Sequence, residues 1–367
     1  MVKYKEMPLS DYVSLGRSGL RVSPFCLGAM TFGEDWGWGS SVEDSQRILD
    51  RFVDFGGNFI DTANGYTKGH SEKIIGDHVG RHPARRDRLV IATKFFTNMY
   101  RGDPNAGGAS RKSLVSACDQ SLRRLQTDYI DLYWMHCWDR FTPIEETIRA
   151  LDDLVSAGKV RYLGFSDTPA WKVAQAQVTA QLNGWTPLIA LQLEYSLLER
   201  TIEGELIPAA LEFGLGVTPW SPLRSGMLTG KYTRESAGAA TPGRGTFVTR
   251  AFTDEAFRVV DVLKAVATEA DTTPARTALA WVRQRPGIAS TIIGARTIEQ
   301  LDDNLGALET KLTAQQIKTL DEASQPTLGF PHDFIRNVGG FGYNGSTIDG
   351  VAMPVNPLSP QNDQERY

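Results

Sequence analysis

Cysteine is scarce in this chain of 367 residues, and the three that occur, Cys26, Cys118 and Cys137, include no CxxC pair. An odd number without that spacing argues against a disulfide framework and is typical of a reduced, intracellular protein. Long apolar stretches are missing too. No segment approaches the roughly 18 apolar residues of a membrane span, and the N-terminal "MVKYKEMPLSDY" lacks the apolar core of a signal peptide. We therefore expect a cytoplasmic protein that does not enter a membrane.

Positive charge is not in excess either, since the net charge is −4. A chain without a basic surplus offers no general surface for nucleic acid or for an anionic membrane, so we expect neither as a partner. Hydrophobic residues make up 41% of the sequence, which is enough for a large core. The length corresponds to two or three average domains, but an α/β barrel of this size forms one domain.

The sequence is rich in one pattern, the alternation of short β-rich runs with helical periodicity. The predicted strands are 24–30, 58–62, 88–94, 129–136, 160–166, 188–195, 216–221 and 290–294. Each is followed by at least one segment with the apolar spacing of a helix, and such β-then-α units predict an α/β fold of the closed (β/α)8 TIM-barrel type. An open, doubly wound sheet is the alternative. It requires a GxGxxG phosphate loop after the first strand, and "LGAMTFGEDWGWG" lacks that spacing.

Four segments lie outside the repeat. Residues 13–22 predict an N-terminal β-hairpin that turns at "GRSG", and extra helices are expected within 254–284. Residues 233–250 are rich in Gly, Ala and Thr and are expected to be mobile. We expect one barrel domain over residues 1–324, and an irregular tail over 325–367 that either covers the barrel mouth as a lid or is partly disordered.

Polar side chains close three neighbouring predicted strands. Asp61, Lys94 and His136 stand at these strand ends, and Tyr66 follows Asp61 in a loop. Each has a simple structural explanation alone: a turn cap, a solvated lysine, a core histidine and a rim aromatic. Because chemistry in such barrels occurs at the carboxyl ends of the strands, their coincidence predicts a shared site. A metal site is not indicated, since strand alternation turns Cys137 away from His136.

Motifs along the chain resemble those of a known family. "FIDTANGY", "VIATK", "LYWMHCWD", "YLGFSD", "LQLEYSL", "TPWSPL", "GMLTGKY" and "IIGARTIEQLDDNL" resemble the serial motifs of the aldo-keto reductases, in the same order. The resemblance covers about residues 14 to 324, and one motif alone would carry little weight. "SDTPAW" and the run from "HCWD" to "TPIEE" resemble more specifically the aryl-alcohol dehydrogenase-like branch.

This resemblance implies reversible, metal-free hydride transfer between NADP(H) and a carbonyl carbon. Tyr66 would be the general acid, Asp61 would pair with Lys94, and His136 would hydrogen-bond the carbonyl oxygen. A free phenol has a pKa of about 10. A cation about 4 Å away is worth about 4 kcal/mol at an effective dielectric of about 20, so we expect Lys94 to lower the pKa of Tyr66 by as much as about 3.

The resemblance also implies a set of cofactor contacts. The nicotinamide carboxamide would be held by Ser166, Asp167 and Gln192, and its ring would stack on Trp220. The pyrophosphate would run along Ser221, Leu223 and Ser225. The adenosine 2′-phosphate would be framed by Gly294, Arg296, Gln300 and Asn304. A guanidinium engages two phosphate oxygens at once, so Arg296 favours NADPH over NADH. Asp167 stands where many members carry Asn, Cys137 replaces a commoner Arg, and Trp220 replaces a Tyr or Phe. An ionised Asp167 accepts from the carboxamide NH2 but cannot donate to its oxygen.

Aromatic residues near the strand ends suggest the substrate side. We expect Trp36, Trp38, Phe95 and Trp138 to line it, with Phe330 or Phe341 of the tail as further candidates, although each also fits ordinary rim packing. Such a lining favours a flat or apolar carbonyl, for example an aryl aldehyde. Two other functions remain open: a redox-sensing accessory subunit that binds NADPH with little turnover, and a barrel hydrolase or lyase without nicotinamide. The sequence is equally compatible with a monomer and a homo-oligomer.

Overall fold

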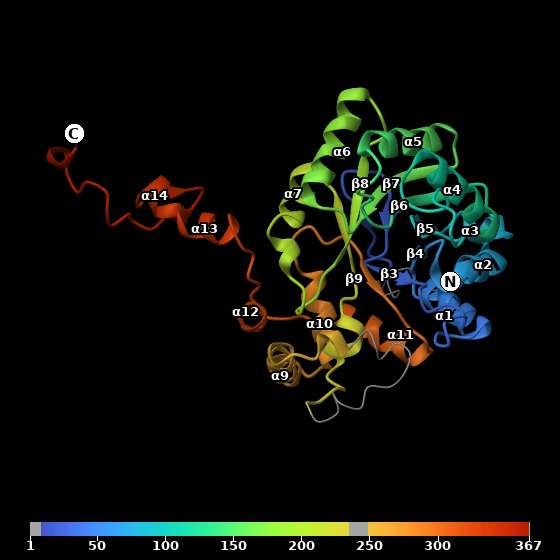
Figure 1. Ribbon diagram of the computed structural model, residues 1–367. Helices are drawn as coiled ribbons and strands as arrows, with labels where there is room; N and C mark the ends of the chain where they lie inside the picture. Colours follow the sequence, from blue (N-terminus) through green and yellow to red (C-terminus); the bar gives the residue numbers. More distant parts are fainter. Residues whose placement is uncertain (1–8, 235–248, 367) are drawn as a thin grey trace. The chain divides into compact units, whose positions relative to one another are not determined.

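The computed structural model of the chain describes residues 9–234 and 249–366 (Figure 1). It divides into two units, residues 1–324 and 325–367. Most of the segment expected to be mobile, residues 235–248, lies outside the described residues. No helix within the described ranges is long and apolar enough to cross a bilayer.

Eight parallel strands form the central sheet of the larger unit. They are β3 (Phe25–Gly28), β4 (Phe59–Asp61), β5 (Val90–Phe95), β6 (Ile130–Met135), β7 (Val160–Ser166), β8 (Leu188–Glu194), β9 (Gly216–Trp220) and β10 (Thr291–Ile293), in the order β10-β3-β4-β5-β6-β7-β8-β9. The sheet closes where β9 bonds to the segment that leads into β10: the amide of Val217 donates to the carbonyl of Gly287, and the amide of Ala289 donates to the carbonyl of Val217, each over 2.9 Å. The predicted (β/α)8 barrel is therefore confirmed, and the open sheet is excluded.

Helices cover the outside of this barrel (Figure 1). They are α1 (Val42–Asp54), α2 (His70–Ile75), α3 (Pro83–Arg86), α4 (Arg111–Leu125), α5 (Ile144–Ser156), α6 (Ala170–Asn183), α7 (Leu206–Phe213), α9 (Asp254–Glu269), α10 (Pro274–Arg283), α11 (Ile298–Leu305) and α12 (Ala314–Ala323). Local sequence sets where several begin. Ser41 caps α1 by accepting from the amide of Asp44, and Thr297 caps α11 in the same way through the amide of Gln300.

Strand alternation sorts the apolar residues into two layers. Cys26, Phe59, Leu132 and Trp134 pack inside the barrel, whereas the alternate residues of the same strands face the helices. The predicted N-terminal hairpin, β1 (Val13–Ser14) with β2 (Arg21–Val22), is present. Leu15 and Val22 of the hairpin segment pack with the interior residues. Both layers along the strands are therefore largely apolar, and polar side chains gather at the carboxyl ends of the strands.

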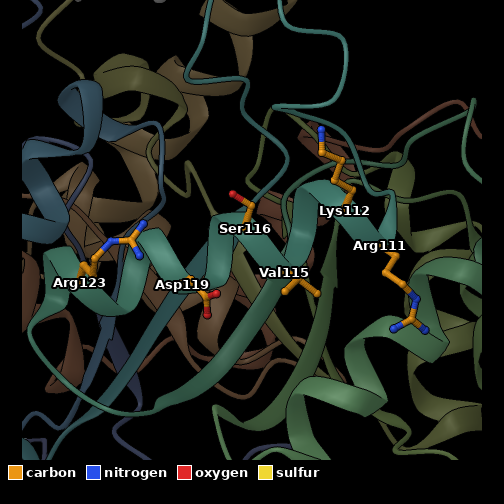
Figure 2. Close-up of a pocket in the computed structure, with 6 residues that line it drawn as sticks. All are labelled: Arg111, Lys112, Val115, Ser116, Asp119 and Arg123. Carbon is orange, nitrogen blue, oxygen red and sulfur yellow. The ribbon is translucent and has the colours of Figure 1, made fainter.

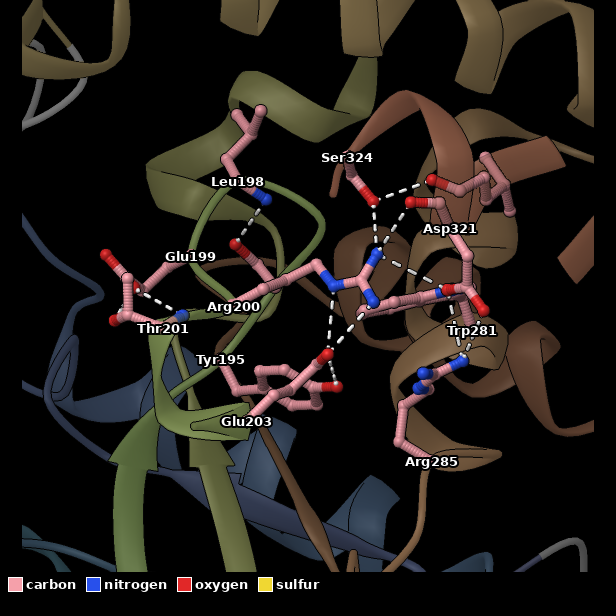
Figure 3. Close-up of polar contacts among 12 residues, drawn as sticks. Tyr195, Leu198, Glu199, Arg200, Thr201, Glu203, Trp281, Arg285, Asp321 and Ser324 are labelled. Carbon is pink, nitrogen blue, oxygen red and sulfur yellow. Dashed lines mark hydrogen bonds and ion pairs between the residues drawn. The ribbon is translucent and has the colours of Figure 1, made fainter. Parts of the chain in front are cut away.

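A polar network ties the loop after β8 to α10 and α12 (Figure 3). The guanidinium of Arg200 donates from Nε and Nη2 to the two carboxylate oxygens of Glu203, over 2.8 and 3.0 Å, and from Nη1 to Ser324 Oγ over 2.8 Å. Trp281 Nε1 donates to Asp321 Oδ1 over 2.9 Å. Arg200 is only 7% exposed. The network therefore fixes the end of α12, where the larger unit ends.

The smaller unit has more regular structure than we expected. It contains α13 (His332–Asn337), α14 (Gly339–Tyr343) and a short antiparallel pair, β11 (Thr347–Ile348) with β12 (Val351–Ala352). Each element is too short to give a sustained apolar period, which is why the sequence suggested an irregular tail. A lid over the barrel mouth stays a prediction.

Candidate active site

The inward-facing residues at the carboxyl ends of the strands form a polar ring. Asp61 ends β4, Lys94 lies near the end of β5, Ser166 ends β7, and Gln192 lies near the end of β8. All four side chains are buried, and Lys94 is 0% exposed. His136 follows β6 directly and is half-buried. The barrel geometry thus gathers polar groups from strands that are far apart in sequence.

Lys94 is the centre of this ring. Its ammonium donates to Asp61 Oδ1, to the carbonyl of Thr62 over 2.9 Å and to the hydroxyl oxygen of Tyr66 over 3.0 Å. An ammonium has three donors and no acceptor, so every donor of Lys94 is used. Burial by itself would lower the pKa of Lys94, but the charge of Asp61 and the contact with Tyr66 outweigh it and raise that pKa. Lys94 is therefore a fixed cation at neutral pH.

Asp61 is held through both of its carboxylate oxygens. Oδ1 accepts from Lys94, and Oδ2 accepts from Gln192 Nε2 over 3.0 Å. A buried carboxylate is stable only when it is paired and hydrogen-bonded, and both conditions are met here. Gln192, which we expected at the nicotinamide carboxamide, also supports the ion pair.

A strained turn positions Tyr66. Tyr66 begins the 3-10 segment η2 (Tyr66–Gly69), in which Thr67 and Lys68 have φ values of 46° and 61°. Non-glycine residues rarely adopt this left-handed conformation, and such strain is maintained only where surrounding contacts enforce it. Thr67 supplies two of them: its Oγ1 donates to the carbonyl of Phe32 over 2.8 Å and accepts from the amide of Ser71 over 3.0 Å.

Lys94 acts on the pKa of Tyr66 in the expected direction, but the net shift of that pKa is upward and not downward. The protein packed around the phenol raises its pKa above the usual value, and Lys94 offsets only part of that effect. The reason is that desolvation disfavours the phenolate, and the neighbouring charge of Asp61 disfavours it further. Tyr66 therefore keeps its proton at neutral pH, which suits a proton donor.

His136 stands beside this phenol as a neutral imidazole. The two ring centroids are 5.7 Å apart at an interplanar angle of 81°. Burial and the charge of Lys94 lower the pKa of His136 to about 3. A neutral imidazole carries one N–H donor, so His136 can donate a hydrogen bond without carrying charge.

Asp167 and Trp220 form a second feature of the mouth. Trp220 Nε1 donates to Asp167 Oδ1 over 3.1 Å, and the amide of Asp167 donates to the carbonyl of Gln192 over 3.2 Å. Asp167 keeps exposed surface, yet the surrounding protein raises the pKa of its carboxyl to about 6, and Glu194 adds to this rise. Asp167 therefore changes charge close to neutral pH.

The comparison with known proteins identifies the family. A model of the "Aldo/keto reductase family" matches residues 24–325. The chain belongs to the aldo/keto reductase family. An aryl-alcohol dehydrogenase of Pestalotiopsis microspora is 37% identical over 337 residues, covering 89% of this chain and 84% of the relative. Norsolorinic acid reductase B of Aspergillus parasiticus is 37% identical over 340 residues (89% and 87%), and the uncharacterized oxidoreductase YrpG of Bacillus subtilis is 39% identical over 322 (85% and 95%).

The residues expected at the adenosine phosphate lie around the start of α11. The amide of Arg296 donates to Gln300 Oε1 over 2.9 Å, and Asn304 Nδ2 donates to the carbonyl of Gly294 over 3.2 Å. A Cβ added to Gly294 would meet no atom within 4 Å, so open space adjoins this glycine. Arg296 is exposed, and no carboxylate among the described residues forms an ion pair with its guanidinium.

The residues expected along the pyrophosphate lie in the loop after β9. Ser221 and Ser225 have φ values of 54° and 53°, and Leu223 precedes the 3-10 segment η5 (Arg224–Thr229). Arg224 of this segment forms an ion pair with Glu194. Arg224 was not among the predicted site residues, although it stands between two residues that were assigned to the phosphates.

One of the expected substrate residues, Trp36, stands beside Tyr66, and Trp38 contacts Trp36. The rings of Trp36 and Trp38 are 5.5 Å apart, and Trp36 meets the Tyr66 ring at 6.4 Å and 78°. Trp138 contacts Trp171 at 5.6 Å and 75°. Trp171 was not predicted as a site residue, although the motif "SDTPAW" contains it.

Phe95 does not belong to this set. It is 0% exposed, and its ring lies 5.0 Å from that of Tyr133, whose hydroxyl donates to the carbonyl of Leu114 in α4. Strand alternation explains this: because Lys94 points into the barrel, its neighbour Phe95 points outward into the helix layer. The prediction for Phe95 is corrected accordingly.

A shallow hollow of about 570 Å³ lies elsewhere, on the outer surface of α4 (Figure 2). Its lining residues are Arg111, Lys112, Val115, Ser116, Asp119 and Arg123. All of them come from one helix, and none belongs to the polar ring at the strand ends. The hollow therefore contributes nothing to the chemistry described above.

Proposed function

We propose that this aldo-keto reductase reduces an aldehyde or ketone to the alcohol with NADPH, reversibly and without a metal, and that Tyr66 donates the proton. The observation that carries the proposal is the contact between Lys94 and Tyr66. Lys94 can only donate, so the phenol oxygen is the acceptor in that bond. The hydroxyl hydrogen of Tyr66 is thereby left free for another acceptor.

The remaining residues of the ring support this role. A carbonyl that accepts a hydride becomes an alkoxide and needs a proton at the same oxygen. Tyr66, with its raised pKa, holds a proton at neutral pH, and His136 offers a neutral N–H beside it. Two donors that converge on one oxygen both orient the carbonyl and stabilise the developing charge. Asp61 keeps Lys94 charged and in place.

The residues at the mouth fit a nicotinamide dinucleotide. Bound NADPH would supply the hydride. Arg296, with no carboxylate partner among the described residues, suits the 2′-phosphate, and the open space at Gly294 leaves room for the adenosine end. Trp220 offers an aromatic face, while Ser166, Asp167 and Gln192 offer polar groups for the carboxamide. We therefore favour NADPH as the cofactor.

The substrate we propose is an aryl or other bulky apolar carbonyl. Trp36 stands next to Tyr66 and contacts Trp38, and Trp138 contacts Trp171 in a second aromatic pair. The name of one relative, aryl-alcohol dehydrogenase, supports the same substrate class. We expect the enzyme to work in the cytoplasm, where NADPH is available.

Two measurements test the proposal. Titration with NADPH should quench the fluorescence of the eight tryptophans, and 4-nitrobenzaldehyde should then consume NADPH. Tyr66→Phe removes only the hydroxyl and should lower turnover by about 10²- to 10⁴-fold without weakening NADPH binding. Tyr133→Phe, which loses a hydroxyl in the helix layer, is the matched control and should keep its turnover.

Other outcomes would contradict the proposal. Without quenching at high micromolar NADPH, both the reductase and the redox-sensing subunit would be excluded. Quenching without turnover on a range of carbonyls would favour the subunit. A Tyr66→Phe variant with full turnover, under conditions where the chemical step limits the rate, would remove Tyr66 from its role.

A further inference from the structure

Two loops of the barrel mouth are joined beside Tyr66. The β3–α1 loop carries Trp36 and Trp38, and the β4–α2 loop carries Tyr66. The first is closed at its base, where the amide of Ser40 donates to the carbonyl of Thr31 over 2.8 Å. That base also bonds to the β10–α11 loop, because Thr31 Oγ1 donates to the carbonyl of Ala295 over 2.9 Å. The tip of the loop, with Trp36, extends beyond this anchor.

A hydrogen bond between His70 and Asp35 holds the tip. His70 Nδ1 lies 2.7 Å from Asp35 Oδ2, and both side chains are about one-third exposed, at 35% and 32%. Asp35 directly precedes Trp36, and His70 begins α2, four residues after Tyr66. The bond to His70 lowers the pKa of Asp35, and the charge of Lys68 adds a little. The pair therefore links the residue next to Trp36 to the helix that follows Tyr66.

The approach of the two loops crowds the space around Gly33. A Cβ at this position, where φ is 94°, would lie 2.9 Å from Asp35 Oδ2, 3.2 Å from His70 Nδ1 and 3.3 Å from Thr67 Oγ1. A positive φ and such close contacts both favour glycine. The contact between His70 and Asp35 therefore lies where the two loops pack against Gly33.

We propose that Asp35 is a positioning residue for substrate recognition: bonded to His70, it holds the β3–α1 loop so that the indole of Trp36 stands edge-on to the Tyr66 ring. The inference rests on the proposed function and deepens it, because it assigns part of the aryl specificity to a residue that does not touch the substrate. Trp36 then provides an aromatic wall at a fixed angle beside the proton donor.

A double-mutant cycle tests whether Asp35 acts through Trp36. With 4-nitrobenzaldehyde, Asp35→Ala and Trp36→Leu should each raise KM by about three- to tenfold, the range of an edge-to-face aromatic contact, with kcat within about twofold. The double variant should resemble Trp36→Leu alone, because Asp35 has nothing left to position. Full additivity, or an Asp35→Ala variant with unchanged KM, would overturn the proposal.

Asp50→Ala is the matched control. Asp50 pairs with His78 Nε2 over 2.8 Å. Asp50 lies near the carboxyl end of α1, and because barrel helices run opposite to the strands, that end of the helix lies at the end of the barrel opposite the mouth. This pair therefore lies away from the mouth, and its loss should leave KM unchanged. A rise equal to that of Asp35→Ala would show a general effect of surface ion pairs and contradict the positioning role.

A second readout separates this proposal from the proposed function. Acrylamide quenching of tryptophan fluorescence needs no turnover. Asp35→Ala should increase quenching relative to the wild type, and should have no such effect when combined with Trp36→Leu. If no carbonyl is reduced but this difference appears, the proposed function fails and the positioning of Trp36 stands. If turnover is present and the difference is absent, the positioning role fails alone.

Discussion

The ammonium of Lys94 lies 3.0 Å from the hydroxyl oxygen of Tyr66 and donates its other two hydrogen bonds to Asp61 and to the carbonyl of Thr62. This relationship determines the direction of the Tyr66 proton, because a phenol oxygen that accepts from Lys94 directs its own hydrogen elsewhere. It also makes the ion pair of Asp61 and Lys94 part of both the stability and the proposed chemistry of the protein.

The first prediction concerns that ion pair. Asp61→Asn leaves the buried cation of Lys94 uncompensated and should lower the free energy of unfolding by about 3–5 kcal/mol, measured by urea denaturation. Asp61→Asn combined with Lys94→Met removes both charges and should recover most of that loss. If the double variant is less stable than either single one, the two residues do not form a coupled pair.

The second prediction concerns the pH dependence of cofactor binding. Asp167, with a pKa of about 6, is neutral below that pH and negative above it. A negative charge favours the positive ring of NADP+ over the neutral ring of NADPH, and opposite charges about 4 Å apart are worth about 1 kcal/mol even in water. The ratio of Kd for NADPH to Kd for NADP+ should therefore rise by about three- to fourfold between pH 5 and pH 7.

Asp167→Asn is the control for this pH dependence, because an amide does not ionise. Its ratio of dissociation constants should be flat over the same range. Taking a ratio cancels the ionisation of the 2′-phosphate, which both cofactor forms share. A slope that persists in Asp167→Asn would assign the effect to another group.

The third prediction concerns cofactor choice. Arg296→Ala should raise KM for NADPH by about 10- to 100-fold, the value of a lost charge-assisted phosphate contact, and should change KM for NADH far less. Arg276→Ala removes a nearby arginine that already pairs with Asp303, and should affect neither cofactor. Equal effects of Arg296→Ala on both cofactors would refute the contact with the 2′-phosphate.

The fourth prediction concerns the network around Arg200 (Figure 3). Arg200→Ala leaves Glu203 without its buried partner and should cost about 3–5 kcal/mol in the free energy of unfolding. Arg234→Ala breaks an exposed pair with Asp261, at 48% and 55% exposure, and should cost at most about 1 kcal/mol. Similar losses from the two variants in urea denaturation would mean that burial does not decide the difference.

Much of the site could be predicted from local sequence. The ends of the strands are visible where apolar runs stop, so Asp61, Lys94 and His136 were placed correctly at neighbouring strand ends. The same alternation that directs Lys94 inward also directs Phe95 outward, so the error at Phe95 was avoidable from the sequence. The net direction of the Tyr66 pKa shift could not be predicted from the sequence, because it depends on how much protein surrounds the phenol.

The sequence by itself determined the order of strands and helices, and with it the family, because strand and helix periodicities and the motifs are written in neighbouring residues. Only the tertiary structure decided which distant groups meet. Gln192 reaches Asp61 across 131 positions, and His70 reaches Asp35 across 35. No local pattern encodes such pairs, since closing the barrel and packing its loops bring them together.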